Sequence, residues 1–459
     1  HVWMSIGGSG DWWVPPLSGL TALVGSALAY LAGARLAGRA GVEGLGRRRT
    51  GLIALAVYAV LPFGVRYATE TRMYALLMVL VLAGYLLVDD LLSGRRRRGG
   101  PLLAGAGVAL VAAALLWSHY WSMWLLGGVG LYALWRLVRE RDPDRRRGAL
   151  TVVVALVVGG VLFLPWVPSL LYQSAHTGTP WGKTFRPATM LVVTLVDFAG
   201  GSFSESQLSS YFLVVLLALA VFGAVRAGVV TVRGRLDERV RTEVVVLALT
   251  VGLGWAASAV THNTFASRYA AVFFPLFVLC VAAGVAVTRT PRATAVVLAL
   301  VVVAGVAGST FEVVRDRTQA GQATEEIVKD AAAHPGPAVV LTCPDQLAPS
   351  VQRALAGRMA DPPAVIPFPT AGDPAFVDWV DYAKRNKAAD PAAFLQKAGP
   401  RIPPNATVYV AVNTSYVTLE GKCEALLGAL GATRAGARLS TGNLDDFYEA
   451  MDLWVFRPR

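Results

Sequence analysis

Long apolar runs separated by short polar segments occupy the first two thirds of the chain. A helix needs about 20 mostly apolar residues to cross the hydrocarbon core of a bilayer. The runs that approach this length cover residues 17–37, 51–65, 73–88, 102–117, 122–134, 150–164, 211–230, 244–260, 270–287 and 293–309. The pattern therefore predicts a polytopic α-helical membrane protein with about ten transmembrane helices.

The loops between these runs alternate between rich and poor in arginine. Arginines gather near residues 35–49, 95–98, 136–147, 233–241 and 289–292. The basic residues of the intervening loops are Arg66, Arg72, Lys183, Arg186 and Arg268. Because loops with excess Lys and Arg stay in the cytoplasm, the other loops and the C-terminal region are predicted to be extracytoplasmic. One of them, residues 169–210, contains a short apolar stretch that predicts an interfacial or re-entrant helix.

Residues 313–459 have the composition of a soluble domain. The predicted strands are residues 338–342, 364–368, 407–412 and 453–456, and the predicted helices are residues 324–333, 346–356, 376–385, 392–397 and 420–430. This alternation predicts an extracytoplasmic α/β domain with a largely parallel sheet. No Gly-rich phosphate-binding sequence follows a predicted strand. We therefore interpret the domain as accessory to the membrane part at residues 1–312, serving packing or acceptor docking.

Composition supports a membrane location and argues against nucleic-acid binding. The chain has 459 residues, of which 55 % are hydrophobic and 16 % are charged, whereas an ordinary soluble domain is about 25 % charged. Mean hydropathy is +0.51. The net charge of +12 does not indicate a nucleic-acid partner, because the arginines stand in short loops between apolar runs.

Three cysteines are present. Cys280 lies in an apolar run and is expected to be a buried core residue. Cys343 ends a predicted strand, and Cys423 stands near the start of a predicted helix. Outside the cytoplasm these two can form a disulfide, and the alternative is two unpaired buried thiols. No Cys or His spacing indicates a structural metal site.

Four groups of polar and aromatic residues fall on the extracytoplasmic side. They are Arg66, Tyr67, Glu70, Arg72 and Tyr74; His119 and Tyr120; Tyr172, Gln173, His176, Trp181, Lys183 and Arg186; and His262, Asn263, Arg268 and Tyr269. Arginine offers a planar, two-pronged donor that suits phosphate, and aromatic rings can stack on a sugar.

Each of these residues also has an ordinary interpretation. The aromatic residues can belong to the belt at the membrane surface, His119 can be a hydrogen-bonded turn residue, and Arg268 can snorkel. Residues 66–74 can form a polar hairpin between two helices. However, Arg66, Arg72 and Arg268 together lie on the face that is poor in basic residues. This indicates that they have partners or a ligand.

Four short pieces carry a resemblance to a known family. They are Arg66-Tyr67 followed by Glu70-Thr-Arg72-Met-Tyr74; Ser118-His119-Tyr120; Phe163-Leu-Pro165-Trp166; and Ser267-Arg268-Tyr269 before an apolar run containing Pro275. On these pieces, residues 1–310 resemble the GT-C superfamily of membrane glycosyltransferases. The similarity is to the bacterial branch of glycosyltransferase family 39, related to protein O-mannosyltransferases and aminoarabinose transferases. The Glu-x-Arg-x-Tyr piece is moderately specific at this place, and the others are individually weak.

The resemblance implies a multi-pass enzyme of the bacterial plasma membrane. Such an enzyme takes a sugar, here mannose or a pentose, from a polyprenyl-phosphate donor at the outer face. It passes the sugar by inverting displacement to a hydroxyl of a lipid, glycan or protein acceptor. The candidate substrate-binding residues are Arg66, Tyr67, Arg72, Tyr74, His119, Tyr120, Lys183, Arg186, Arg268 and Tyr269. We favour Arg72 and Arg268 at the phosphate, because cations stabilise an anionic leaving group. Some members use a divalent metal and others none, and no ligand set stands out here.

The catalytic base of this family is an acidic residue, usually Asp, in the first extracytoplasmic loop, where a His-Pro-Pro-type piece follows. Neither feature occurs in this chain, and its opening residues resemble the tail of that segment. We therefore expect the main base to lie upstream of residue 1, so that the chain is either a fragment or has a misassigned start, and we expect it to be inactive on its own. The visible carboxylates on this face are Asp11, Glu70, Asp197 and Glu205. Glu70 is the strongest candidate, either to position a substrate or as a substitute base.

A polytopic transporter or lipid-linked sugar flippase is the second hypothesis. Transporters often show internal repeats and broken helices near the midplane. No repeated segment is present, and the ionisable residues gather at one face. A non-enzymatic anchor that displays the C-terminal domain is the third hypothesis, but an anchor needs neither about ten crossings nor clustered charge.

Overall fold

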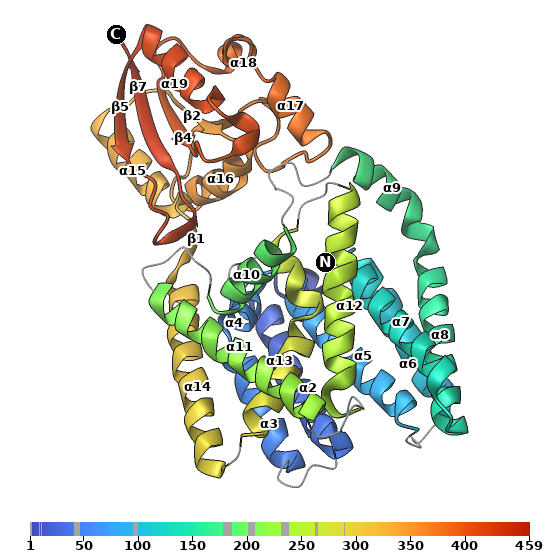
Figure 1. The fold of residues 1–459 in the computed structure, drawn as a ribbon. Coiled ribbons are helices and arrows are strands. Elements are labelled where there is room, and N and C mark those ends of the chain that lie inside the picture. Colours follow the sequence, from blue (N-terminus) through green and yellow to red (C-terminus); the bar gives the residue numbers. More distant parts are fainter. Residues whose placement is uncertain are drawn as a thin grey trace. The chain divides into compact units, whose positions relative to one another are not determined.

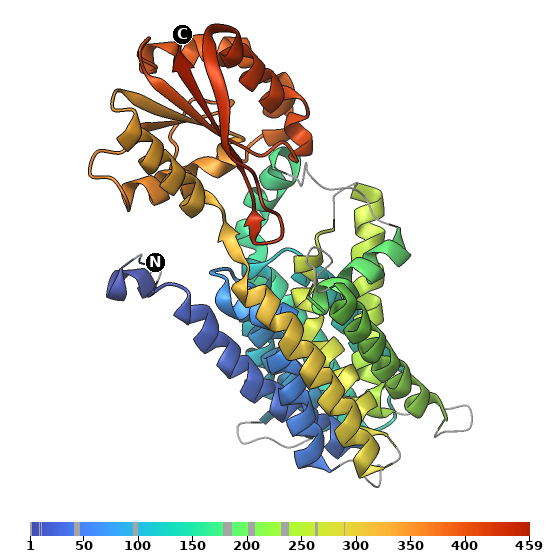
Figure 2. The same ribbon diagram turned by 90° about the vertical axis from the view of Figure 1, so that its left-hand side faces the viewer.

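The computed structural model describes residues 2–459 except 9, 11, 41–45, 95–99, 178–185, 201–206, 231–237, 262–264 and 289. The chain divides into two compact units, and Figures 1 and 2 show the elements of each. The helical unit comprises His1–Ser169 and Lys183–Val313. The C-terminal unit comprises Leu170–Gly182 and Val314–Arg459.

The helical unit is built almost entirely of α-helices. They are α1 (Val2–Gly7), α2 (Pro16–Ala40), α3 (Arg47–Val60), α4 (Pro62–Thr69), α5 (Tyr74–Leu92), α6 (Gly100–Ser118), α7 (Ser122–Arg139), α8 (Pro143–Phe163), α9 (Val167–His176), α10 (Pro187–Phe198), α11 (Gln207–Val230), α12 (Glu238–Thr261), α13 (Phe274–Ala286) and α14 (Pro291–Val314). The short 3-10 helices are η1 (Leu164–Trp166) and η2 (Ser267–Val272). The end of α9, from Leu170 to His176, belongs to the C-terminal unit.

Six segments among the described residues are long and apolar enough to cross a membrane. They are Pro16–Ala37, Tyr74–Leu92, Gly100–Ser118, Pro143–His176, Thr242–Val260 and Pro291–Val314. The bent pair of α3 and α4 makes a seventh if it counts as one span. Shorter apolar helices cover Pro187–Phe198, Tyr211–Gly223 and Phe274–Ala286. The chain is therefore a mostly helical, candidate multi-pass membrane protein, as the apolar runs predict.

Two runs that were expected to be continuous helices are broken, each beside a proline. The run at residues 51–65 bends by 60° between α3 and α4. Pro62 opens α4 there, because proline has no N–H to donate and is favoured at the first helical position. The run at residues 270–287 begins as η2 and becomes α-helical only at Phe274, with Pro275 in the first turn. Both breaks lie beside polar residues of the candidate site.

Helix α13 is the central helix of the unit. Every residue from Phe274 to Ala286 is buried, so the helix is apolar on all sides, as a fully enclosed helix must be. Gly284 permits the closest approach, because an added Cβ would lie 1.7 Å from the carbonyl oxygen of Ala220 on α11. Small residues commonly let membrane helices approach in this way.

The C-terminal unit contains a five-stranded mixed sheet. In spatial order the strands are β3 (Ala364–Pro367), β2 (Ala338–Cys343), β4 (Thr407–Val412), β7 (Asp452–Pro458) and β5 (Arg434–Ser440). The first three are parallel, and β7 pairs antiparallel with both β4 and β5. A separate parallel pair joins β1 (Asp316–Thr318) to β6 (Phe447–Glu449).

Helices cover both faces of this sheet (Figures 1 and 2). They are α15 (Ala320–Ala333) and α16 (Ala348–Ala356) on one face, and α18 (Pro391–Ala398) and α19 (Lys422–Thr433) on the other. Alternate residues of β2 point to opposite faces of the sheet, each of which has its own hydrophobic core. Leu341 packs toward α18 and α19, and Val340 packs toward α15 and α16. Cys343 and Cys423 form a disulfide that joins the end of β2 to the first turn of α19.

Two features of this unit differ from the sequence prediction. The sheet is mixed, because β7 runs antiparallel to β4 and β5. Strand β5 was not predicted. The helix expected at residues 376–385 begins only at Tyr382, where α17 (Tyr382–Ala388) starts. The side chains of Asp373 and Asp378 accept hydrogen bonds from the backbone N–H groups of Ala375 and Val380. Such bonds stabilise turns in competition with a helix.

Candidate functional site

A chain of ion pairs forms where α4 ends and α5 has not yet begun. Glu70 is the C-terminal capping residue of α4. Its Oε1 lies 3.2 Å from Nε of Arg72, and its Oε2 lies 3.7 Å from Nε of Arg66. Arg66 also reaches α10, where its NH1 lies 3.6 Å from Oδ1 of Asp197. The short helix α4, set by Pro62, thus presents Arg66 to two carboxylates from different parts of the chain.

The sequence named Asp197 only as one of four carboxylates on this face, and Glu70 was preferred to it. It stands near the end of the apolar helix α10, and its side chain is only 12 % exposed. Its Oδ2 is buried and has no hydrogen-bond partner among the described residues. An acidic residue in an otherwise apolar helix was the available signal, because a carboxylate is costly to bury without a partner. The sequence could not show that Asp197 pairs with Arg66, because the two residues lie far apart along the chain.

Arg268 joins the group from η2. Its guanidinium carbon lies 5.6 Å from the ring centroid of Tyr269, within the range of a cation–π contact. Tyr67 and Tyr74 also interact electrostatically with the Arg268 charge. Arg268 is therefore a partly buried cation surrounded by tyrosines, which is not how an arginine that snorkels to solvent is placed.

Aromatic rings connect the surroundings of Arg268 to residues 66–74 and 118–121. Tyr67 and Tyr74 have ring centroids 4.5 Å apart, and His119 lies 5.8 Å from Tyr74 and 5.1 Å from Tyr269. Trp121 lies 5.7 Å from Tyr269. Residues of the first, second and fourth groups predicted from the sequence thus lie close together. Asp197 adds a residue from the segment 169–210, which also holds the third group. We call the set Arg66, Glu70, Arg72, Tyr74, His119, Asp197, Arg268 and Tyr269 the arginine–tyrosine cluster.

Two predicted residues are placed differently. Tyr120 accepts a hydrogen bond of 2.9 Å from Nε1 of Trp166, so it contacts η1. Arg186 is exposed at the N-terminal cap of α10. Lys183 lies outside the described residues, as do Trp181, His262 and Asn263.

His119 is held as a neutral imidazole. Burial, and secondly the charge of Arg268, lower the pKa of His119 to about 4. Its Nδ1 accepts a hydrogen bond of 3.1 Å from the backbone N–H of Trp121, which requires that nitrogen to be unprotonated. His119 therefore contributes a ring and a hydrogen-bond acceptor to the cluster, and no positive charge near neutral pH.

This pKa predicts how stability depends on pH. The unfolded chain binds a proton at His119 near pH 6.5, and the folded protein does so only near pH 4. Stability is therefore complete above pH 6.5 and falls by about 3 kcal/mol as the pH drops to 4. Thermal unfolding in detergent from pH 7 to pH 4.5 should show a steeper loss for the wild type than for His119→Gln. Parallel curves for the two proteins would contradict this assignment.

An apolar pocket lies between the membrane helices. It lies among α5, α6, α7, α8, α12 and α13. Its polar groups are two pairs: the Tyr85 hydroxyl donates to Oε1 of Glu243 at 2.6 Å, and the hydroxyls of Tyr132 and Thr242 lie 2.9 Å apart. The sequence did not predict this pocket, because its lining resembles any other apolar helix surface.

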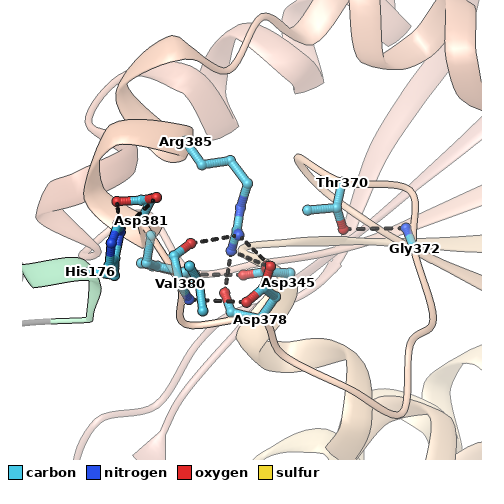
Figure 3. A network of polar contacts seen from close by, with 9 residues as sticks. His176, Asp345, Thr370, Gly372, Asp378, Val380, Asp381 and Arg385 are labelled. Carbon is cyan, nitrogen blue, oxygen red and sulfur yellow. Dashed lines mark hydrogen bonds and ion pairs between the residues drawn. The ribbon is translucent and has the colours of Figure 1, made fainter. Parts of the chain in front are cut away.

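A second polar network lies beyond the carboxyl ends of β2 and β3 in the C-terminal unit (Figure 3). Oδ1 of Asp345 accepts a 2.8 Å hydrogen bond from the Tyr382 hydroxyl, and Oδ2 lies 3.8 Å from NH2 of Arg385. Arg385 also pairs with Asp378 at 3.1 Å. Asp345 and Tyr382 are fully buried, and burial raises the pKa of the Asp345 carboxyl. This network therefore fixes the loop before α17.

Among the described residues, no group of three or more His, Cys, Asp or Glu could hold a metal ion. No protein-family model matches this chain, and no curated protein matches it. The arginine–tyrosine cluster and the apolar pocket are therefore the features of the molecule that bear on its function.

Proposed function

We propose that the protein is an integral membrane glycosyltransferase of GT-C type, with about ten transmembrane helices and an extracytoplasmic C-terminal domain. It transfers a sugar, mannose or a pentose, from a polyprenyl-phosphate donor to an acceptor hydroxyl by inverting displacement. The single observation that carries this proposal is the convergence of Arg66, Arg72 and Arg268 with two carboxylates and tyrosine rings. Arg66 and Arg72 come from one segment of the chain, and Arg268 comes from a distant one.

The cluster has the groups that this reaction needs. The acceptor oxygen attacks the anomeric carbon, and the bond from that carbon to the phosphate oxygen breaks. Polyprenyl phosphate leaves as an anion, and arginines beside it stabilise the charge that develops. The tyrosine rings of the cluster offer faces on which a sugar can stack.

The proton of the acceptor hydroxyl needs a carboxylate within hydrogen-bond reach. Glu70 lies between Arg66 and Arg72, so we assign it the role of positioning these cations. Asp197 has a buried oxygen without a hydrogen-bond partner among the described residues. We therefore assign proton acceptance to Asp197 among the carboxylates of the cluster, in place of the upstream base that the resemblance implies, so the chain is expected to be active as it stands. The apolar pocket offers its walls to an isoprenoid chain of the donor.

The direct test is transfer from radiolabelled polyprenyl-phosphate-mannose, with a pentose donor in parallel, in membranes that contain the protein. We expect label in an acceptor fraction, with the anomeric configuration inverted. Asp197→Asn should lower kcat by at least about 100-fold while donor binding is retained. Transfer from neither donor, in membranes where the protein is inserted, would overturn the proposal.

One observation favours a second function, a transporter or lipid-linked sugar flippase. Glu243 is fully buried on α12 beside the apolar pocket, and ionisable residues inside a membrane often mark transport pathways. Proteoliposomes with a fluorescent lipid-linked sugar would distinguish the two functions. Movement between leaflets that is lost in Glu243→Gln, without sugar transfer, would establish the second function.

A further inference from the structure

The segment that follows α14 places two arginines where the chain leaves the membrane. The candidate span Pro291–Val314 has 24 residues, and at 1.5 Å per residue it rises about 36 Å, slightly more than the roughly 30 Å hydrocarbon core. Val314, at its end, is 75 % exposed. Arg315 and Arg317 follow within three residues, so chain continuity alone places them at the level of the lipid headgroups.

Both arginines contact one tyrosine of the C-terminal unit. The guanidinium carbons of Arg315 and Arg317 lie 4.2 Å and 5.0 Å from the ring centroid of Tyr448. Tyr448 lies on β6, which pairs in parallel with β1. The β1–β6 pair thus holds both arginines beside one ring.

The neighbouring groups complete the surface. Arg315 donates through NH2 to the carbonyl oxygen of Phe447 at 3.1 Å and to that of Leu444. The Leu444 side chain is 58 % exposed, so an apolar tip stands beside the two cations. Three acidic residues, Asp316, Asp445 and Asp446, are exposed in the same segments, and Asp446 accepts a hydrogen bond from the Asn443 amide. The surface thus combines an apolar tip, two arginines and a tyrosine, the groups that favour a membrane surface, with three carboxylates beside them.

We propose that Arg315, Arg317 and Tyr448 bind the phosphate of a membrane phospholipid headgroup, with Leu444 and Val314 in contact with its acyl region. This surface anchors the C-terminal unit to the leaflet from which α14 emerges. The proposal does not depend on the proposed sugar transfer, because none of these residues belongs to the arginine–tyrosine cluster.

The test uses the full chain in lipid nanodiscs. Leu444→Cys is labelled with a fluorophore, and quenching by lipids that carry a nitroxide on the headgroup is measured. Labelling is specific because Cys280 is buried and the other two cysteines are bridged. Asn405→Cys is the control position, since it lies in an exposed turn before β4, away from β1 and β6.

We expect strong quenching at residue 444 and little at residue 405. In the Arg315→Gln, Arg317→Gln double variant, quenching at residue 444 should fall on the order of threefold or more, because each arginine near a lipid surface adds to the attraction. Arg438→Gln is the matched control, because Arg438 also lies over an aromatic ring, Trp454, at 5.8 Å. It should leave the quenching unchanged.

Two outcomes would overturn the proposal. Quenching at residue 444 that is as low as at residue 405 would show that no lipid contacts the surface. Equal quenching with and without the two arginines would show that they do not bind the headgroup. An intact Cys343–Cys423 bridge, seen by gel mobility, shows that each variant has folded.

Discussion

Replacing Arg268 with glutamine is expected to lower sugar transfer by about 100- to 1,000-fold, the usual effect of removing one donor that stabilises a developing anion. Arg268 is the cation that the tyrosines of the cluster surround, and its guanidinium lies over the Tyr269 ring. Water is largely displaced from a position like this, so a charge there acts more strongly on a leaving phosphate than an exposed charge does. The measurement is kcat/KM for transfer from a labelled polyprenyl-phosphate sugar.

Arg268→Lys and Arg186→Gln are the informative comparisons. Lysine keeps the charge but loses the planar, two-pronged donor, so Arg268→Lys should recover only part of the activity. Arg186 is exposed at the start of α10, and its replacement should change transfer by less than about threefold, as for a screened surface charge. If Arg268→Gln and Arg186→Gln lose activity equally, the special role of Arg268 is wrong. Insertion into the membrane is checked for each variant by alkaline extraction.

The pattern of apolar runs predicted the helices well because length and hydropathy are local properties. A run such as residues 102–117 needs no tertiary information to be recognised as a span, and α6 covers it. The breaks beside Pro62 and Pro275 were missed in the division into runs, although proline at a helix start is a local signal. In an apolar run, hydropathy does not distinguish one helix from two that meet at an angle.

The sequence predicted members of the cluster from three segments, but it did not predict the contacts between them. Arg66, Glu70, Arg72 and Arg268 stand out because charge on the arginine-poor face is unusual. The pairing of Arg66 with Asp197 depends on how α4 and α10 pack, and no periodicity encodes that. The same reason explains why the apolar pocket beside Glu243 was missed, since its shape arises only when six helices assemble.

In the C-terminal unit, the parallel strands β2 and β4 were expected because each is a short apolar run followed by a helix. Strand β5 was missed because its residues, Arg434–Ser440, are mostly exposed and carry no apolar alternation. The strand order depends on the pairing of β5 with β7, which the pattern of apolar residues could not predict. An edge strand of this kind is recognised by its hydrogen-bonded neighbour more than by its own sequence.

Removing the disulfide is expected to lower the stability of the C-terminal unit by about 4 kcal/mol, the chain-entropy value for a closed loop of this size. Cys343 and Cys423 are separated by 80 residues, and the loop between them includes β3, α17, α18 and β4. Without the bridge, the unfolded chain gains the freedom of this loop, while the folded unit keeps its sheet contacts. Amide hydrogen exchange in β2 and β4 of the intact protein measures the effect, with exchange about 1,000-fold faster in Cys343→Ser, Cys423→Ser.

Cys280→Ala is the matched control, because it also removes a buried cysteine but lies on α13 in the helical unit. It should leave exchange in β2 and β4 unchanged. Thiol labelling of the native protein gives an independent check: Cys343 and Cys423 should react only after reduction, and immediate labelling of both would exclude the bridge. If the bridge forms but its removal changes exchange by less than about tenfold, the unfolded loop retains structure that already restricts it, and the entropy argument fails for this domain.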